Sequence, residues 1–145
     1  MPAYYAQGGH IARAEAERRA VRALDLVGLP AEEGATTQGL GAAALKKLEL
    51  ARALATEPRL LLADESLGGL DAAEMERAAE MLQEIRNQLG ITIIWVEHIM
   101  GVLMRIVDRV IVLDHGEKIF DGRPESAARD ERVTEVYLGR GHGHG

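Results

Sequence analysis

The six residues LLLADE at positions 60–65 predict a buried β-strand that ends in two carboxylates. Four consecutive apolar residues before Asp64 and Glu65 suit a strand that is buried on both of its faces. Because adjacent residues of a strand point to opposite sides, one carboxylate can face a Mg²⁺ shell while the other faces a water molecule. An Asp-Glu pair can equally be a polar turn before a helix, so its interpretation depends on the surrounding sequence.

Helical and strand patterns alternate on both sides of this stretch. Apolar residues recur at helical spacing before it, and a β-branched run follows it at residues 91–96 and ends in Glu97-His98. Asp71 with Glu74 predicts a capping box at the start of the intervening helix, and Gly90 predicts its end. A strand, a helix and a second strand predict a parallel pair whose carboxyl ends lie together, which brings Asp64-Glu65 and Glu97-His98 to one edge. We further expect helices over residues 11–27, 42–56, 99–107, 124–130 and 133–138, and a hairpin of strands 109–113 and 118–120.

Composition narrows the class of protein. The 145 residues are 47% hydrophobic, which is enough for a core, and 17 Lys and Arg against 23 Asp and Glu give a net charge of −6. This charge argues against a nucleic-acid-binding surface. The chain has no Cys, which excludes disulfides and thiolate sites and favours a reducing cytoplasm. Since no apolar run approaches the roughly 18 residues of a membrane span, we expect a soluble α/β domain.

Four ordered motifs resemble the ATP-binding domain of ABC-type ATPases. LELARAL (48–54) with PRLLLADE (58–65) resembles the signature helix and Walker B strand, and GLD (69–71) resembles the D-loop. IIWVEH (93–98) resembles the strand of the switch histidine, and DRVIVLDHG (108–116) the hairpin after it. The resemblance extends from about residue 14 to 139. GRPE (122–125) with VTEVYLG (133–139) is most similar to the ATP-binding subunits of branched-chain amino acid importers.

The resemblance implies a partial P-loop NTPase domain of the ABC type. Its α/β fold would have a mostly parallel sheet, flanking helices, a C-terminal hairpin and short helices. The implied organisation is a loose segment (1–10), a helical-subdomain remnant (11–57), the C-terminal part of the ATPase core (58–139) and a disordered tail (140–145).

The resemblance also implies a role for each motif residue. Asp64 would hold Mg²⁺ through water, Glu65 would be the general base, and His98 would contact the γ-phosphate of ATP. Asp71 would act across a subunit interface. A lone His or Asp at such places is more often structural, but the spacing of the motifs favours the catalytic role for His98. Asp71 can serve as a helix cap and as a site residue at the same time.

The sequence departs from this family's pattern at two important places. It contains no Gly-x-x-x-x-Gly-Lys-Ser/Thr loop, which cradles phosphates in the family and precedes the region represented here. The signature motif Leu-Ser-Gly-Gly-Gln also falls on altered residues, so that Gly41 replaces the Ser and Ala43 replaces the second Gly. Ser66, where a Pro usually follows the Asp-Glu pair, is a smaller departure. The positions of the signature motif are Leu40, Gly41, Ala42, Ala43 and Ala44.

The sequence thus predicts the C-terminal half of an ATP-binding subunit that uses ATP and Mg²⁺ to energise branched-chain amino acid uptake. Its expected partners are a second nucleotide-binding subunit and membrane permease subunits, without nucleic acid, on the cytoplasmic face of the membrane. The chain alone is expected to be inactive, since most phosphate contacts are missing. Two alternatives remain, a non-catalytic module that pairs with a complete subunit and a truncated product without a role of its own. Loss of the N-terminal strands would expose sheet edges and apolar surface.

Overall fold

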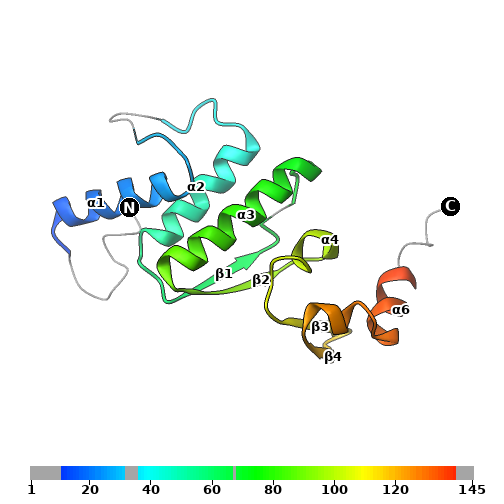
Figure 1. Ribbon diagram of the computed structural model, residues 1–145. Coiled ribbons are helices and arrows are strands. Elements are labelled where there is room, and N and C mark those ends of the chain that lie inside the picture. Colours follow the sequence, from blue (N-terminus) through cyan, green and yellow to red (C-terminus); the bar gives the residue numbers. More distant parts are fainter. Residues whose placement is uncertain (1–10, 32–35, 67, 140–145) are drawn as a thin grey trace. The chain divides into compact units, whose positions relative to one another are not determined.

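The computed structural model describes residues 11–31, 36–66 and 68–139, which form two compact units (Figure 1). The first unit ends at His98 and the second begins at Ile99. The predicted loose segment 1–10 and disordered tail 140–145 lie outside the described residues. No helix in the described ranges is long and apolar enough to cross a membrane.

The first unit contains the predicted parallel strand–helix–strand arrangement. Its strands β1 and β2 pair in parallel, with Leu60 opposite Thr92 and Asp64 opposite Val96. The prediction of a parallel pair is therefore confirmed, and the carboxyl ends of the two strands lie side by side. The elements of this unit are α1 (Arg13–Leu26), α2 (Ala42–Leu54), β1 (Leu60–Asp64), α3 (Ala72–Leu89) and β2 (Thr92–Val96).

Helix α3 begins and ends where its sequence signals predict. The Asp71 carboxylate accepts a hydrogen bond from the Glu74 backbone N–H at 2.8 Å, and the Glu74 carboxylate accepts one from the Asp71 N–H at 2.9 Å. Gly90 follows the helix with φ 62°, a left-handed conformation that costs glycine little. The capping box satisfies two of the backbone donors that every helix leaves unpaired at its start.

Replacing Asp71 by Ala is expected to lower the free energy of unfolding by about 1 kcal/mol, because the helix loses its side-chain cap. Asp71→Asn is the matched control, since Asn caps helices about as well as Asp and removes only the charge. Urea unfolding followed by circular dichroism measures both. Equal losses in the two variants would mean that the charge, rather than the cap, stabilises the helix.

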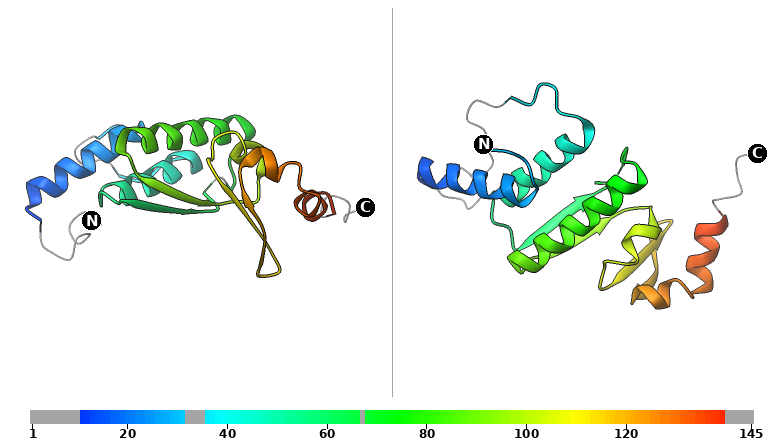
Figure 2. Two further views of the ribbon diagram at one scale, coloured as in Figure 1. Left: turned by 60° about the horizontal axis from the view of Figure 1, so that its bottom comes forward. Right: turned by 45° about the horizontal axis from the view of Figure 1, so that its top comes forward.

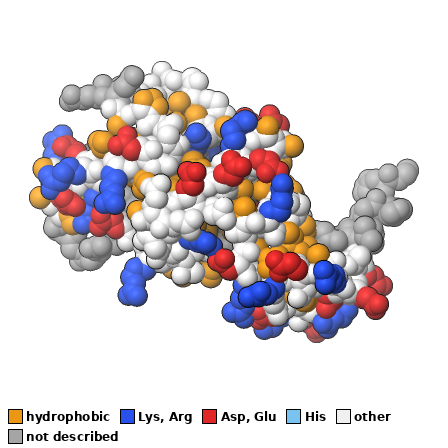
Figure 3. Space-filling model, in the orientation of Figure 1, with side chains coloured by type: hydrophobic (Ala, Val, Ile, Leu, Met, Phe, Trp, Pro, Cys, Tyr) orange, Lys and Arg blue, Asp and Glu red, His pale blue; other side chains and the backbone are white. Residues whose placement is uncertain are grey.

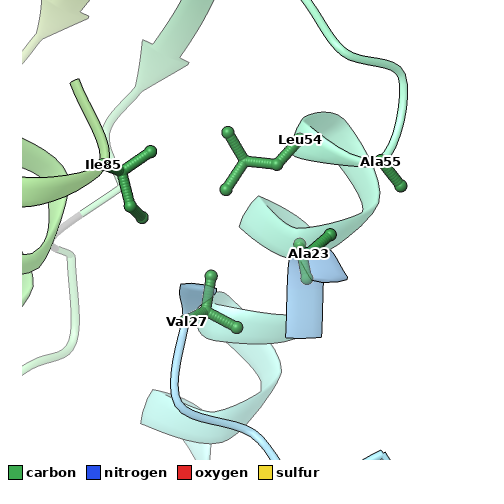
Figure 4. Close-up of a cluster of buried hydrophobic side chains, with 6 residues drawn as sticks. Ala23, Val27, Leu54, Ala55 and Ile85 are labelled. Carbon is green, nitrogen blue, oxygen red and sulfur yellow. The ribbon is translucent and has the colours of Figure 1, made fainter. Parts of the chain in front are cut away.

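Three helices share one hydrophobic cluster in the first unit (Figure 4). Val27 follows α1 and Ile85 lies on α3, and each is only 1% exposed. The cluster contains residues of both the predicted helical-subdomain remnant (11–57) and the predicted ATPase core (58–139). Its members are Ala23, Val27, Ala51, Leu54, Ala55 and Ile85.

The surface of α1 carries charged side chains of both signs, which are visible as blue and red groups at the left of Figure 3. Arg13 pairs with Glu17 at 2.8 Å, and Arg19 bridges Glu15 at 2.8 Å and Glu57 at 3.0 Å. Hydrogen bonds from Arg19 and then Arg18 lower the pKa of the Glu15 carboxyl. These charged side chains therefore pair with one another along the surface of the helix.

Strand β1 is buried on one face only, so the expectation of burial on both faces is wrong. Leu61 is 5% exposed, whereas Leu60 and Leu62 on the other face are 48% and 68% exposed. The reason is that α2 and α3 lie on one side of the β1–β2 ribbon, and no helix of the described part of this unit covers the other side (Figure 2, left).

The second unit is built on a hairpin. Strands β3 (Val110–Asp114) and β4 (Glu117–Gly122) pair in antiparallel fashion, and His115 and Gly116 turn the chain with φ of 47° and 83°. Helices α4 (Met100–Leu103), α5 (Pro124–Ala127) and α6 (Glu131–Gly139) complete the unit. The helix predicted over 99–107 is shorter than expected, because hydrogen bonds after Met104 reach back only three residues at Arg105 and Ile106 and form turns.

One carboxylate joins three parts of this hairpin. Asp121 accepts hydrogen bonds from Arg109 at 2.7 and 2.9 Å and from Lys118 at 2.9 Å. These two cations, Arg109 foremost, hold the pKa of Asp121 well below its usual range. The carboxylate is therefore ionised at neutral pH and ties the start of β3 to the end of β4.

Candidate functional site

Three of the predicted site residues lie at the carboxyl end of the β1–β2 ribbon. Asp64 is the last residue of β1 and lies opposite Val96. The Glu65 backbone N–H donates to the Val96 carbonyl at 2.9 Å, and His98 follows Val96 by two residues. All three side chains, of Asp64, Glu65 and His98, are exposed and therefore open to a ligand. The parallel pairing of the strands creates this arrangement, as the sequence predicts.

The backbone at Glu65 differs from the strand geometry on which the prediction relied. Strand β1 ends at Asp64, and Glu65 has φ 46°, in the left-handed region. A residue other than glycine occupies this region at a cost of about 1 kcal/mol or more. The direction of the Glu65 side chain is therefore set by this turn and by the hydrogen bond to Val96, and not by the alternation of a strand. Such strained positions occur often at functional sites.

A pocket of about 660 Å³ in the first unit reaches the end of β1. Asp64, Glu65 and Ala43 line it together with side chains of α2 and α3, whereas Asp71 and His98 do not. Its six acidic side chains outnumber its three basic ones, so the pocket by itself disfavours a polyphosphate. The charged lining residues are Asp25, Glu49, Asp64, Glu65, Glu74, Glu84, Lys46, Lys47 and Arg77.

The positions of the predicted signature motif (40–44) coincide with the start of helix α2. Gly41 is the N-cap, with extended backbone angles, and as a glycine it has no side chain that could cap the helix. The positive end of the helix dipole is thus present, as expected, but the hydroxyl that a Ser would supply is missing. Ala43 alone among these residues lines the pocket beside the two carboxylates.

Residues beyond the predicted set also belong to this pocket. The Ser66 hydroxyl oxygen is buried and has no hydrogen-bond partner within the described residues, and it lies directly after the two carboxylates. Lys46, Lys47 and Arg77 bring positive charge to the same lining. For Ser66, the sequence signal was its place after the Asp-Glu pair, where a Pro usually stands. Nothing in the sequence pattern indicated that Lys46, Lys47 and Arg77 would line the pocket.

The acidic residues at the end of β1 can supply part of the ligand set of a Mg²⁺ ion, but not all of it. Among the described residues, no group of three or more His, Asp and Glu side chains could hold a metal ion. Mg²⁺ keeps most of its water ligands and takes one or two carboxylates, with the remaining oxygens coming from phosphates. The exposed Asp64 carboxylate can supply such a contact, provided that other ligands come from outside these residues.

Comparisons with known proteins identify relatives along most of the chain. No family model matches it. It is 34% identical, over 88% of its length, to the high-affinity branched-chain amino acid transport ATP-binding protein LivG of Escherichia coli. It is 37% identical, again over 88% of its length, to the methionine import ATP-binding protein MetN of Staphylococcus saprophyticus. The chain spans about half of LivG (50%) and 38% of MetN.

Solved structures share the fold. cbiO1 from Clostridium perfringens, described as part of the ABC transporter complex cbiONQ, matches 96% of this chain with a TM-score of 0.79 and 27% identity. The ADP conformation of MJ1267, an ATP-binding cassette of an ABC transporter, matches 92% with a TM-score of 0.79 and 23% identity, which supports the fold alone. This chain covers 57% and 54% of those chains. The predicted fold class is therefore confirmed.

Proposed function

We propose that this chain, which is a homologue of the ABC transporter ATP-binding proteins and shares the fold of their ATPase domains, supplies the hydrolytic half of an ATP-binding cassette. The observation that supports the proposal is that Asp64 and Glu65 lie beside Val96 at the carboxyl ends of two parallel strands, and that His98 follows Val96 by two residues. Ligands of open α/β sheets bind at this edge. The homologues LivG and MetN are named for amino acid transport, so an amino acid is the proposed cargo, of the branched-chain class by the C-terminal resemblance.

Each of the three residues has a role that its chemistry allows. The Glu65 carboxylate accepts a proton from the attacking water and orients that water. Asp64 holds Mg²⁺, through water, and His98 donates a hydrogen bond to the terminal phosphate. When bound, MgATP supplies the phosphoryl group and the metal charge that neutralises it.

The remaining predicted residues are proposed to act at a subunit interface. Asp71 and the positions 40–44 would contact the nucleotide site of a second ATP-binding subunit, with the cassette attached to permease subunits at the cytoplasmic face of the membrane. Asp71 already caps α3 and keeps one carboxylate oxygen, Oδ2, outside that cap. The net charge of −6 supports protein partners rather than nucleic acid.

The full chain alone is expected to give no micromolar binding of MgATP in isothermal titration calorimetry. The pocket carries an excess of acidic side chains, and the sequence has no phosphate-binding loop. When the chain is co-expressed with the part of E. coli LivG that it does not match, Mg²⁺-dependent ATP hydrolysis is expected. That LivG part alone is the control. Micromolar binding by the chain alone, or a stable complex that neither binds nor hydrolyses ATP, would contradict the proposal.

A non-catalytic module is the second candidate function, and the altered signature positions favour it. Gly41 and Ala43 remove a hydroxyl and add a Cβ at the start of α2, which weakens contact with a phosphate there. Such a module would pair with a complete ATP-binding subunit. Size-exclusion chromatography with full-length LivG tests it, and the absence of a complex would count against this candidate.

A further inference from the structure

The Ser66 hydroxyl oxygen is buried and makes no hydrogen bond within the described residues. A buried polar group without a partner costs folding free energy, so native proteins keep few of them. Ser66 lines the pocket of the candidate site together with Asp64 and Glu65. An unpaired hydroxyl beside these two carboxylates therefore indicates a partner that arrives with the ligand.

The backbone before Ser66 is held by two hydrogen bonds. The Glu65 N–H donates to the Val96 carbonyl at 2.9 Å, and the Glu65 carbonyl accepts from the Gly68 N–H at 3.3 Å. Glu65 has φ 46°, so Ser66 directly follows a left-handed residue in a hydrogen-bonded turn. These contacts attach the turn that contains Ser66 to the carboxyl ends of both strands, where Asp64 also lies.

Ser66 brings a kind of hydrogen bonding that the other polar side chains of the pocket lack. Every other polar side chain in the described lining is charged. Carboxylates only accept hydrogen bonds and Lys or Arg side chains only donate them, whereas a hydroxyl does both. Mg²⁺ keeps several of its waters when it binds a protein, and each of these waters is a hydrogen-bond donor. The lone pairs of the Ser66 hydroxyl can accept from such a water.

We propose that the Ser66 hydroxyl accepts a hydrogen bond from the water shell of the Mg²⁺ that Asp64 holds, and that this contact positions the shell beside Glu65. The inference rests on the proposed function. Groups that hydrogen-bond to the ligands of a metal change its affinity or the activity by about 10–100-fold. Ser66 is thus a positioning residue, which acts through the water shell. A purely structural role is disfavoured, because the hydroxyl makes no stabilising hydrogen bond within the described residues.

The first part of the test uses the full chain alone. Ser66→Ala is expected to raise the urea midpoint of the first unit, because the substitution removes a buried hydroxyl that has no partner there. Trp95, the single tryptophan of the chain, lies on β2 and reports this transition by its fluorescence. Ser126→Ala, at an exposed serine of α5 in the second unit, is the matched control and is expected to leave the midpoint unchanged. A lower midpoint in Ser66→Ala would show that the hydroxyl stabilises the folded chain, and would overturn the proposal.

The second part uses the complex of the full chain with the part of E. coli LivG that it does not match. In Ser66→Ala, the Mg²⁺ concentration that gives half of the maximal hydrolysis rate is expected to rise by about tenfold or more, whereas the rate at saturating Mg²⁺ changes by less than about threefold. Ser66→Thr keeps the hydroxyl and is expected to retain the Mg²⁺ dependence of the unaltered complex. Mn²⁺ provides a readout that needs no hydrolysis. Electron paramagnetic resonance of the complex with Mn²⁺ and a non-hydrolysable ATP analogue should show the same loss of metal affinity in Ser66→Ala and none in Ser126→Ala.

The outcomes distinguish this proposal from the proposed function. Hydrolysis whose Mg²⁺ dependence is the same in Ser66→Ala would support the function and overturn the role of Ser66. A weaker affinity for the nucleotide with unchanged Mn²⁺ affinity, or a Ser66→Thr complex that behaves like Ser66→Ala, would also overturn that role. A complex that binds Mn²⁺ in a Ser66-dependent way but hydrolyses no ATP would support the role of Ser66 and contradict the proposed function. Failure of the complex to form or to bind nucleotide would overturn both.

Discussion

Replacing Glu65 by Gln in the complex of this chain with the unmatched part of E. coli LivG is expected to lower the rate of ATP hydrolysis by about 10²–10⁴-fold. ATP binding is expected to remain intact. The amide of Gln has nearly the same size as the carboxylate and can still orient water, but it cannot accept the proton. Because Glu65 lies outside β1 in a left-handed turn held by Val96, the substitution leaves the strand pairing untouched. A loss of hydrolysis without a loss of ATP binding is therefore assigned to the chemical step.

Phosphate release under single-turnover conditions and nucleotide affinity are measured on the same complex. Glu80→Gln is the matched control, since Glu80 is an exposed carboxylate on α3 that does not line the pocket. Its expected rate equals that of the unaltered complex. Unchanged turnover in Glu65→Gln would remove Glu65 from the role of general base, and a parallel loss of ATP binding would assign it a binding role instead.

Replacing Ile85 by Ala is expected to lower the free energy of unfolding by about 2–5 kcal/mol. Ile85 is 1% exposed and brings α3 into the cluster formed with Val27 of the α1 end and Leu54 of α2 (Figure 4). Truncation leaves a cavity where three helices meet. Because the total stability of a domain is only about 5–15 kcal/mol, the loss is a large share of it.

Urea unfolding followed by circular dichroism measures this loss. Ile85→Val should cost about 0.5–1.5 kcal/mol, because it removes a single methyl(ene) group. Val21→Ala, at an exposed position of α1, should change the stability by no more than about 0.5 kcal/mol. A loss below about 1 kcal/mol in Ile85→Ala would show that this cluster is not the core of the first unit.

Much of the fold follows from signals that are local in the sequence. The capping box of Asp71 and Glu74 and the left-handed Gly90 define α3, and the His115-Gly116 turn defines the hairpin. The parallel pairing of β1 with β2 follows from the order of the elements. The position of Asp64 beside Val96 at the carboxyl ends of the two strands therefore follows from the same order.

Other features depend on groups that are distant in the chain. The Glu65 turn is held by a carbonyl of β2, and the burial of the Ser66 hydroxyl depends on its surroundings in the fold. The apolar run at residues 60–63 is equally compatible with a strand that is covered on both faces and with a strand that is covered on one face. Local patterns report which side chains are apolar, but they do not report which layers are present to cover them.

Signals within a few residues of sequence thus specify the order of the main elements and the two ends of α3, because caps, turns and periodicity act locally. The folded chain, in contrast, is needed to show that Leu62 is exposed near Asp64, that Glu65 is left-handed, and that the acidic pocket includes Ser66. These features arise from packing between helices and strands that are far apart in the chain. The single covered face of the ribbon is one of them, since burial is a property of the assembled layers.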